Sequence, residues 1–253
     1  MSAATPVLPS TADMADLAWL GEGLVLVVGA SGGVGQALFA VLQARLGAER
    51  VRAASRHTEP RLDLLDEASV AAAAQAVSAW AQAQGQPLRL VIDATGFLHG
   101  QGFEPEKALR QLDPAHMAHA FAVNAIGPAL LMKHLLPLLP RQGRSVFATL
   151  SAKVGSIGDN RLGGWHSYRA SKAALNQLVR TAAIELARSR PQALCVALHP
   201  GTVDTGLSQP FAKTGLTVRS PAEAAERLLG VMAGLPEGGS GGFFDSEGRP
   251  LPW

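Results

Sequence analysis

The 253-residue sequence has one cysteine, one tyrosine and few aromatic residues, which make up 5% of the chain. The single cysteine, Cys195, cannot form an intramolecular disulfide, and this fits a reducing compartment. Its apolar neighbours from Ala193 to Leu198 indicate a buried structural thiol. The 7 histidines are scattered, without a cysteine partner and without a His-Glu-x-x-His pattern. The sequence therefore predicts neither a disulfide framework nor a metal site.

Charged residues are also scarce, at 17% of the chain, and the net charge is only +2. Because no run of basic residues forms a patch, we expect no nucleic-acid partner. No apolar run reaches the length of a membrane span once its prolines, glycines and charged residues are counted. We therefore expect no membrane partner either.

The first basic side chain in the sequence is Arg45, so residues 1–22 contain neither lysine nor arginine. A secretory signal begins with basic residues, and a mitochondrial transit peptide is rich in arginine, so neither is indicated. We predict a cytoplasmic protein in which residues 1–22 form a partly flexible extension. The segment from Met14 to Leu20 is predicted to form a short amphipathic turn that packs on the body of the protein.

Hydrophobic residues, in contrast, make up 47% of the chain, which is enough for a sizeable core. Short apolar runs typical of buried strands alternate with longer patterns typical of helices. Strands are predicted at 24–28, 51–55, 88–93, 144–150, 193–198 and 242–245, and helices at 35–46, 67–84, 114–139, 165–190 and 221–233. This alternation predicts a mainly parallel sheet with helices on both faces. No linker interrupts residues 23–253, so we predict a single doubly wound α/β domain of Rossmann type.

The first predicted strand runs directly into the segment Gly29-Ala30-Ser31-Gly32-Gly33-Val34-Gly35, which a helix follows. Glycines at this point permit a tight turn, a close approach of the backbone to a pyrophosphate and an open helix N-terminus. Glycines alone are weak support, but the order of strand, glycines and helix is typical of a dinucleotide site. The candidate cofactor-binding residues are Gly29, Ser31, Gly33, Val34 and Gly35.

The end of the second predicted strand carries Arg56, where an acid would hold the ribose hydroxyls of NAD. A guanidinium suits a 2′-phosphate, because it can donate two parallel hydrogen bonds to it. The first acid after this strand is Glu59. We therefore favour NADP(H) as the cofactor over NAD(H), although a solvated arginine is the alternative interpretation of Arg56.

The only tyrosine, Tyr168, is followed four residues later by Lys172, within a predicted helix. At this spacing both side chains project from one helix face. A phenol with a pKa of about 10 is a poor base near neutral pH, but a nearby ammonium lowers that value. The pair is therefore a candidate acid/base that exchanges a proton with a carbonyl or hydroxyl oxygen. The alternative is a pair on a solvated helix face.

These motifs, in this order, resemble those of the classical short-chain dehydrogenase/reductase family over residues 24–253. Asp63-Leu64 is similar to the pair that contacts the adenine in that family. Asp93-Ala94-Thr95-Gly96 is similar to its Asn-Asn-Ala-Gly segment, with Asp93 in place of the first asparagine. Segments 155–165 and 248–253 resemble the C-factor and sniffer-type carbonyl reductase branch. The further cofactor contacts that the resemblance implies are Asp63, Leu64, Ala94, Thr95, Gly96, Tyr168, Lys172, Pro200, Gly201, Val203 and Thr205.

The resemblance implies an NADP(H)-dependent oxidoreductase that interconverts a carbonyl and an alcohol on a small molecule. Tyr168 would exchange the proton, Lys172 would lower the phenol pKa and hold the nicotinamide ribose, and Asn124 would position a relay water. The family also implies a homo-oligomer, most simply a dimer formed by helices 114–139 and 165–190. The segments expected to line the pocket, 97–108, 156–165 and 205–217, indicate no particular substrate.

One position departs from the family pattern. The fifth strand of the family ends in Ser-Ser-x-x-Gly, whose second serine is catalytic, whereas this chain has Ser151-Ala152-Lys153-Val154-Gly155. Ser151 is our candidate for the carbonyl-binding hydroxyl, although on a regular strand it would point away from the face that position 152 presents. Ser156 is the alternative. The departure also keeps open a non-catalytic or weakly catalytic nucleotide-binding sensor of C-factor type.

Overall fold

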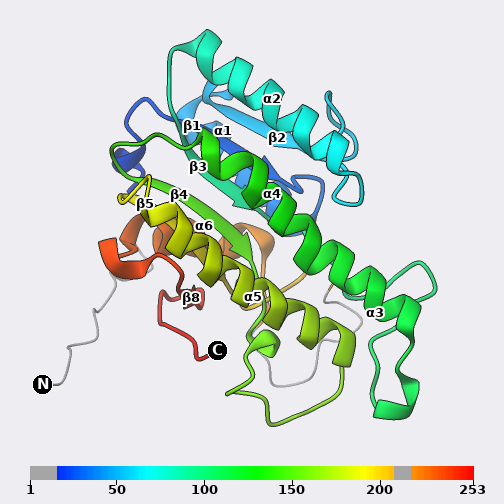
Figure 1. Cartoon of the computed structure of the whole chain (residues 1–253). Coiled ribbons are helices and arrows are strands. Elements are labelled where there is room, and N and C mark those ends of the chain that lie inside the picture. Colours follow the sequence, from blue (N-terminus) through cyan, green and yellow to red (C-terminus); the bar gives the residue numbers. More distant parts are fainter. Residues whose placement is uncertain (1–15, 208–217) are drawn as a thin grey trace, which may run out of the picture.

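Within residues 16–207 and 218–253, which the computed structural model of the chain describes, a six-stranded parallel sheet has the strand order β2-β1-β3-β4-β5-β8. The strands are β1 (Leu24–Val28), β2 (Val51–Ala54), β3 (Leu88–Asp93), β4 (Ser145–Leu150), β5 (Ala193–Leu198) and β8 (Phe243–Phe244). The strands β1, β4 and β5 are buried along their whole length, as expected for a sheet covered on both faces. The predicted doubly wound α/β fold is confirmed (Figure 1).

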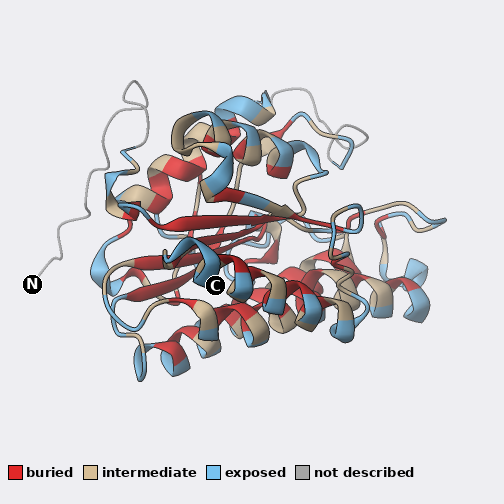
Figure 2. Ribbon diagram, turned by 90° about the horizontal axis from the view of Figure 1, so that it is seen from above, coloured by how far each residue is buried: buried red, intermediate tan, exposed pale blue. Residues whose placement is uncertain are grey.

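Helices cover the two faces of the sheet, which lies between them in Figure 2. On one face α1 (Gly33–Leu46) and α6 (Pro221–Gly234) pack together and share an apolar core with Val25 and Val27 of β1. On the other face α2 (Glu67–Gln84), α4 (Gly127–Leu135) and α5 (His166–Ala187) meet Leu24 and Leu26. Successive β1 side chains therefore enter opposite cores, as the two-residue period of a strand requires.

The helix predicted at 114–139 is a run of four segments. They are α3 (Pro114–Phe121), a π-helical turn η4 (Ala122–Ile126), α4, and a 3₁₀ turn η5 (Leu136–Leu138). Among the described residues, this run is the one helix long and apolar enough to cross a membrane, by length and composition alone. It packs against α2 and α5, so the fold uses it as a covering helix of the sheet.

Several predicted boundaries shift by one to three residues, and two of these shifts have a visible local reason. β2 ends at Ala54 instead of residue 55, because the Ser55 N–H bonds the Thr58 hydroxyl at 2.9 Å and leaves the ladder. The helix predicted from residue 165 begins at His166, because Trp165 has a left-handed backbone with φ of 52°. A 3₁₀ turn at Ala18–Leu20 confirms the predicted packing of the N-terminal turn, since Leu20 is fully buried; residues 1–15 lie outside the described residues.

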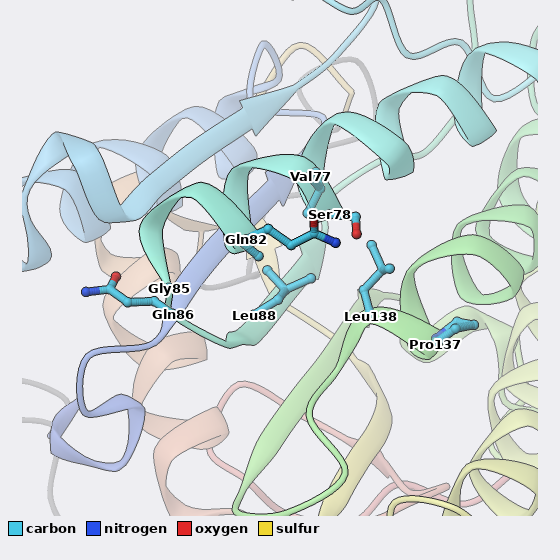
Figure 3. Close-up of a pocket in the computed structure, with 9 residues that line it drawn as sticks. Val77, Ser78, Gln82, Gly85, Gln86, Leu88, Pro137 and Leu138 are labelled. Atoms are coloured by element: carbon cyan, nitrogen blue, oxygen red, sulfur yellow. The ribbon is translucent and has the colours of Figure 1, made fainter.

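A surface hollow lies between the end of α2 and η5, at the start of β3 (Figure 3). Figure 3 shows Val77, Gln82, Leu88 and Leu138 around it. Leu88 is the first residue of β3, so the hollow lies at the amino ends of the strands. It is therefore at the opposite edge of the sheet from the glycine segment and the other candidate site residues, which follow the carboxyl ends.

Candidate active site

The predicted site residues gather at the carboxyl ends of the parallel strands, where open α/β sheets bind their ligands. Gly29 follows β1, Gly96 follows the end of β3, and Ser151 follows β4 directly. The segment from Pro200 follows β5, and α5 brings Tyr168 and Lys172 to the same edge. Figure 1 shows α5 and α4 running side by side over this part of the sheet.

The glycine segment forms a cradle that side chains would fill. Gly29 has a φ of 80°, and a Cβ atom added to Gly35 would lie 2.3 Å from the Gly29 carbonyl oxygen. A Cβ on Gly33 would lie 2.7 Å from the Thr205 methyl carbon, so the segment after β5 closes over this loop. The residue before α1 is Gly32, whose lack of a side chain leaves the first-turn N–H groups open to an anion. This backbone fits the pyrophosphate of a dinucleotide.

The other cofactor-binding candidates on the adenosine side lie around the ends of β2 and η4. Arg56 is exposed, with its guanidinium available to a 2′-phosphate. The Asp63 carboxylate accepts bonds from the Arg61 guanidinium at 2.5 Å and from the Leu65 N–H at 3.1 Å. The Leu64 side chain packs against Gly127, where an added Cβ would lie 2.7 Å away from it. Ser31 is exposed and Val34 is half-buried at the glycine loop.

A fully buried acid holds the turn after β3. Asp93 Oδ1 accepts hydrogen bonds from the Thr95 N–H at 3.0 Å and the Thr95 hydroxyl at 2.6 Å. Its Oδ2 accepts one from the Thr149 hydroxyl of β4 at 2.6 Å. Burial raises the pKa of the Asp93 carboxyl, and these bonds together with the charge of Lys172 oppose the shift. The acid thus ties β3 to β4 and fixes the backbone of Ala94, Thr95 and Gly96.

Asn124 lies in the π-helical turn and is fully buried. Its Nδ2 donates to the Phe97 carbonyl at 2.7 Å and to the Ser171 hydroxyl at 3.1 Å, and its Oδ1 accepts from the Phe97 N–H at 2.7 Å. A Cβ on Gly96 would lie 3.6 Å from Lys172 Nζ and 3.7 Å from Asn124 Oδ1. The fold therefore brings together Gly96, Asn124 and Lys172, which belong to three different elements. The role of Asn124 in a proton relay stays a prediction.

Tyr168 and Lys172 share one face of α5, and both are buried. Lys172 Nζ donates to the Leu150 carbonyl at 2.8 Å and lies 6.0 Å from the centre of the Tyr168 ring. Burial lowers the pKa of Lys172 to about 8, and the Asp93 charge opposes this shift. Burial raises the pKa of the Tyr168 phenol. Burial therefore acts on the phenol pKa in the direction opposite to the effect expected of Lys172, whose influence on the phenol stays a prediction.

Ser151, Ala152 and Ser156, the positions considered for the carbonyl-binding hydroxyl, have different surroundings. The Ser151 hydroxyl donates to Asn176 Oδ1 at 2.7 Å, two helical turns along α5 from Tyr168. Ala152, with an extended backbone, packs in a cluster with Leu98 and Tyr168 instead. Ser156 is buried, and its oxygen accepts a bond from the Asp159 N–H at 3.1 Å. The structure thus does not direct the Ser151 hydroxyl to Tyr168, and its assignment as the carbonyl donor stays a prediction.

The segment that follows β5 completes the edge of the site. Gly201 has a φ of 82°, and β6 (Thr202–Val203) pairs with β7 (Val218–Arg219). Val203 is buried, whereas Pro200 is half-buried. Of the predicted pocket wall at 205–217, residues 208–217 lie outside the described residues.

Asn176, the partner of Ser151, was not predicted from the sequence. The sequence carried a usable signal, because Asn176 follows Lys172 by four residues and so shares the helix face of the acid/base pair.

Comparisons with known proteins agree with this geometry. Residues 33–227 match a family profile described as enoyl-(acyl carrier protein) reductase. The chain is 30% identical to a 1-hydroxy-2-glutathionyl-2-methyl-3-butene dehydrogenase of Rhodococcus, covering 90% of this chain and 99% of that protein. It is 38% identical to the C-signal protein of Myxococcus xanthus, over 58% of this chain and 84% of that protein.

Among solved structures, an NADPH-bound carbonyl reductase from chicken fatty liver is similar, with a TM-score of 0.78 and 28% identity. The match covers 91% of this chain and 98% of that chain. Its NADPH agrees with the NADP(H) predicted from Arg56. These matches agree with the fold, the glycine cradle and the Tyr168–Lys172 pair. The chain therefore belongs to the short-chain dehydrogenase/reductase family of NAD(P)-dependent oxidoreductases.

Proposed function

We propose that the protein is a cytoplasmic, NADP(H)-dependent oxidoreductase that interconverts a carbonyl and an alcohol on a small molecule. One observation carries the proposal: the buried Tyr168 and Lys172 lie on one face of α5, and Gly96 lies beside both Lys172 and Asn124. We also propose that residues 23–253 act as one catalytic domain, preceded by the extension at 1–22.

The chain's own residues would divide the work as follows. A dinucleotide bound in the glycine cradle would supply the hydride for reduction or accept it in oxidation. Tyr168 holds a proton for the carbonyl oxygen, and its raised pKa keeps the phenol neutral and able to donate. Lys172 binds the ribose of the cofactor and stabilises negative charge that develops on the phenol during transfer. Asn124 positions a water that reconnects Lys172 with solvent.

The test of the proposed function is a panel of aldehydes and ketones with NADPH and with NADH, followed by loss of reduced-cofactor absorbance. Consumption of NADPH by at least one carbonyl, with the alcohol identified as product, would support the proposal. Tight NADPH binding without turnover of any carbonyl would favour the second candidate.

That second candidate is a nucleotide-binding sensor of C-factor type with weak or no catalysis. Two observations favour it: the 38% identity to a protein named C-signal, and Ala152 where the family carries its catalytic serine. The buried Tyr168, Lys172 and Asn124 argue against it, because a buried lysine is costly and needs a reason to be there.

Arg56 provides the test of cofactor choice. We expect Arg56→Ala to weaken NADPH binding by about 1.5–3 kcal/mol, the range for hydrogen bonds to charged groups, because the exposed guanidinium pairs with the 2′-phosphate. NADH binding should hardly change, since NADH lacks that phosphate. Titration calorimetry with both cofactors measures this. Arg188→Ala, an exposed arginine just beyond α5, is the control. Equal losses for both cofactors would contradict the role of Arg56.

We also propose a homodimer that pairs the outer surfaces of α4 and α5 with those of a second copy. The apolar side chains of Ile126 and Ile184 are 54% and 52% exposed on this run of helices, and a symmetric contact would cover them. Light scattering at micromolar concentration should give twice the mass of one chain. Ile184→Glu should reduce it to one chain, whereas Ile157→Glu, in a loop, should not. A wild-type mass of one chain would refute the dimer.

A further inference from the structure

The N-terminus of α5, which carries Tyr168 in its first turn, lacks a cap from its own sequence. The residue before the helix is Trp165, in a left-handed conformation with φ of 52° and ψ of 44°. An indole offers no oxygen to accept a hydrogen bond. The first N–H groups of a helix have no partner within the helix and need an acceptor from elsewhere.

Glu106 supplies that acceptor from a distant part of the chain, the segment between β3 and α3. Its main-chain carbonyl accepts the Trp165 N–H at 2.5 Å. Its carboxylate accepts the Ser167 N–H at 3.2 Å and, through its other oxygen, the Ser167 hydroxyl. Glu106 and Ser167 are both buried. Glu106 therefore binds Trp165 and Ser167, the residues on either side of His166, and fixes the start of α5.

The far side of Glu106 is anchored as well. His116 of α3 places Nδ1 3.4 Å from Glu106 Oε1, and Phe103 stacks on the His116 ring with centroids 5.0 Å apart. Burial works against the ionised carboxyl, but the bonds from Ser167 and the charge of His116 outweigh burial, so the pKa of Glu106 is lowered. An anion at a helix N-terminus is also favoured by the helix dipole. Glu106 thus bridges α3 and the first turn of α5.

The residue held by this cap is the neighbour of the acid/base residue. Ser167 directly precedes Tyr168, and the Trp165 ring meets the Tyr168 ring edge-on with centroids 6.2 Å apart. A shift of the first turn would therefore move the phenol relative to Lys172, which is held one turn later by the Leu150 carbonyl. Misplacement of a reacting group by about 1 Å can cost on the order of 10²-fold in rate.

We propose that Glu106 is a positioning residue, which caps α5 across the fold and holds Tyr168 in its reactive place. The effect on rate rests on the proposed function, because it requires Tyr168 to be the proton donor. The effect on the place of Tyr168 does not. Glu106→Gln is the variant of choice, since the amide preserves volume and removes the charge and one acceptor oxygen. Glu22→Gln, at an exposed glutamate just before the amino end of β1, is the control on the opposite edge of the sheet.

The experiment uses Tyr168 as its own probe. Because it is the only tyrosine, labelling tyrosine with ¹³C at the ζ carbon alone gives a single NMR signal that reports this ring without assignment. We expect Glu106→Gln to shift or broaden that signal, and to lower kcat on the order of 10–100-fold with the KM for NADPH unchanged. Glu22→Gln should change neither the tyrosine signal nor kcat.

An unchanged tyrosine signal in folded Glu106→Gln would overturn the proposal. If the signal moves while neither wild type nor variant turns over any carbonyl, the cap stands and the enzymatic function fails. Should Glu106→Gln not fold, Ser167→Ala decides with the same measurements, since it removes the hydroxyl donor and leaves the N–H bond. A silent Ser167→Ala in that case would also overturn the proposal.

Discussion

Tyr168→Phe should lower the kcat for carbonyl reduction by about 10²–10⁴-fold, the contribution typical of general acid catalysis. Such a loss would leave little or no measurable turnover. Only a hydroxyl is lost, and the ring keeps its packing with Ala152, Leu98 and Trp165. The fold and the affinity for NADPH should therefore stay close to those of the wild type. Steady-state kinetics with NADPH titration separates the two effects, and circular dichroism checks the fold.

Lys172→Ala is the informative contrast. Its ammonium serves both the phenol and the cofactor ribose in the proposed mechanism, so turnover and NADPH affinity should both fall. It also donates to the Leu150 carbonyl, so some loss of stability is expected. A Tyr168→Phe variant that retains turnover within a few-fold of the wild type would remove Tyr168 from the proton-donor role, whatever Lys172→Ala does.

The fold was predictable because its signals are local. The strands β3 and β5 and the helix α2 have the predicted bounds. For α2 the reason is visible at both ends, where Asp66 caps the first turn and Gly85 takes a left-handed conformation with φ of 63°. Aspartate before a helix and glycine after it are typical helix-end residues, so both ends could be predicted from the local sequence. The start of α5 was missed by one residue because Trp165 has a left-handed backbone. Its N–H bonds the Glu106 carbonyl, a contact that the local sequence does not encode.

The candidate site likewise has features that the local sequence predicts and features that depend on packing. The order and spacing of the motifs pointed to Tyr168, Lys172 and the glycine segment, and the family resemblance pointed to the segment that begins at Asp93; their roles stay predictions. Spacing could not foresee that Asn124 lies in a π-helical turn, or that Glu106 reaches the first turn of α5, since both depend on packing between distant segments. Spacing also could not show that burial raises the phenol pKa, because burial of Tyr168 is a property of the assembled fold.

The serine position carries the last prediction. If Ser151 supplies the second hydrogen bond to the carbonyl, Ser151→Ala should lower kcat on the order of 10²–10³-fold, by analogy with removal of one oxyanion-hole donor. The structure sets a condition on this role. A serine hydroxyl has one proton, and that of Ser151 goes to Asn176 Oδ1.

Donation to a substrate therefore requires the Asn176 amide to turn and present its Nδ2 to the Ser151 oxygen. Nδ2 is buried and finds no partner among the described residues, so this exchange would give it one and keep the Ser151–Asn176 contact. The serine proton would then be free for a carbonyl oxygen. The carboxylate of Asn176→Asp can only accept a hydrogen bond, so it should hold the Ser151 proton in place. Asn176→Asp should therefore lose as much activity as the separate variant Ser151→Ala.

Four variants then discriminate between the possible donors in kcat measurements with one active carbonyl. A silent Ser151→Ala with a damaging Ser156→Ala would move the role to Ser156. If both are silent, Ala152→Ser should raise kcat, because position 152 packs on Tyr168 and a hydroxyl there would supply the donor that the chain lacks. A large loss in Ser151→Ala, matched by Asn176→Asp and absent from Ser156→Ala, would identify Ser151 as the hydroxyl that binds the carbonyl beside Tyr168.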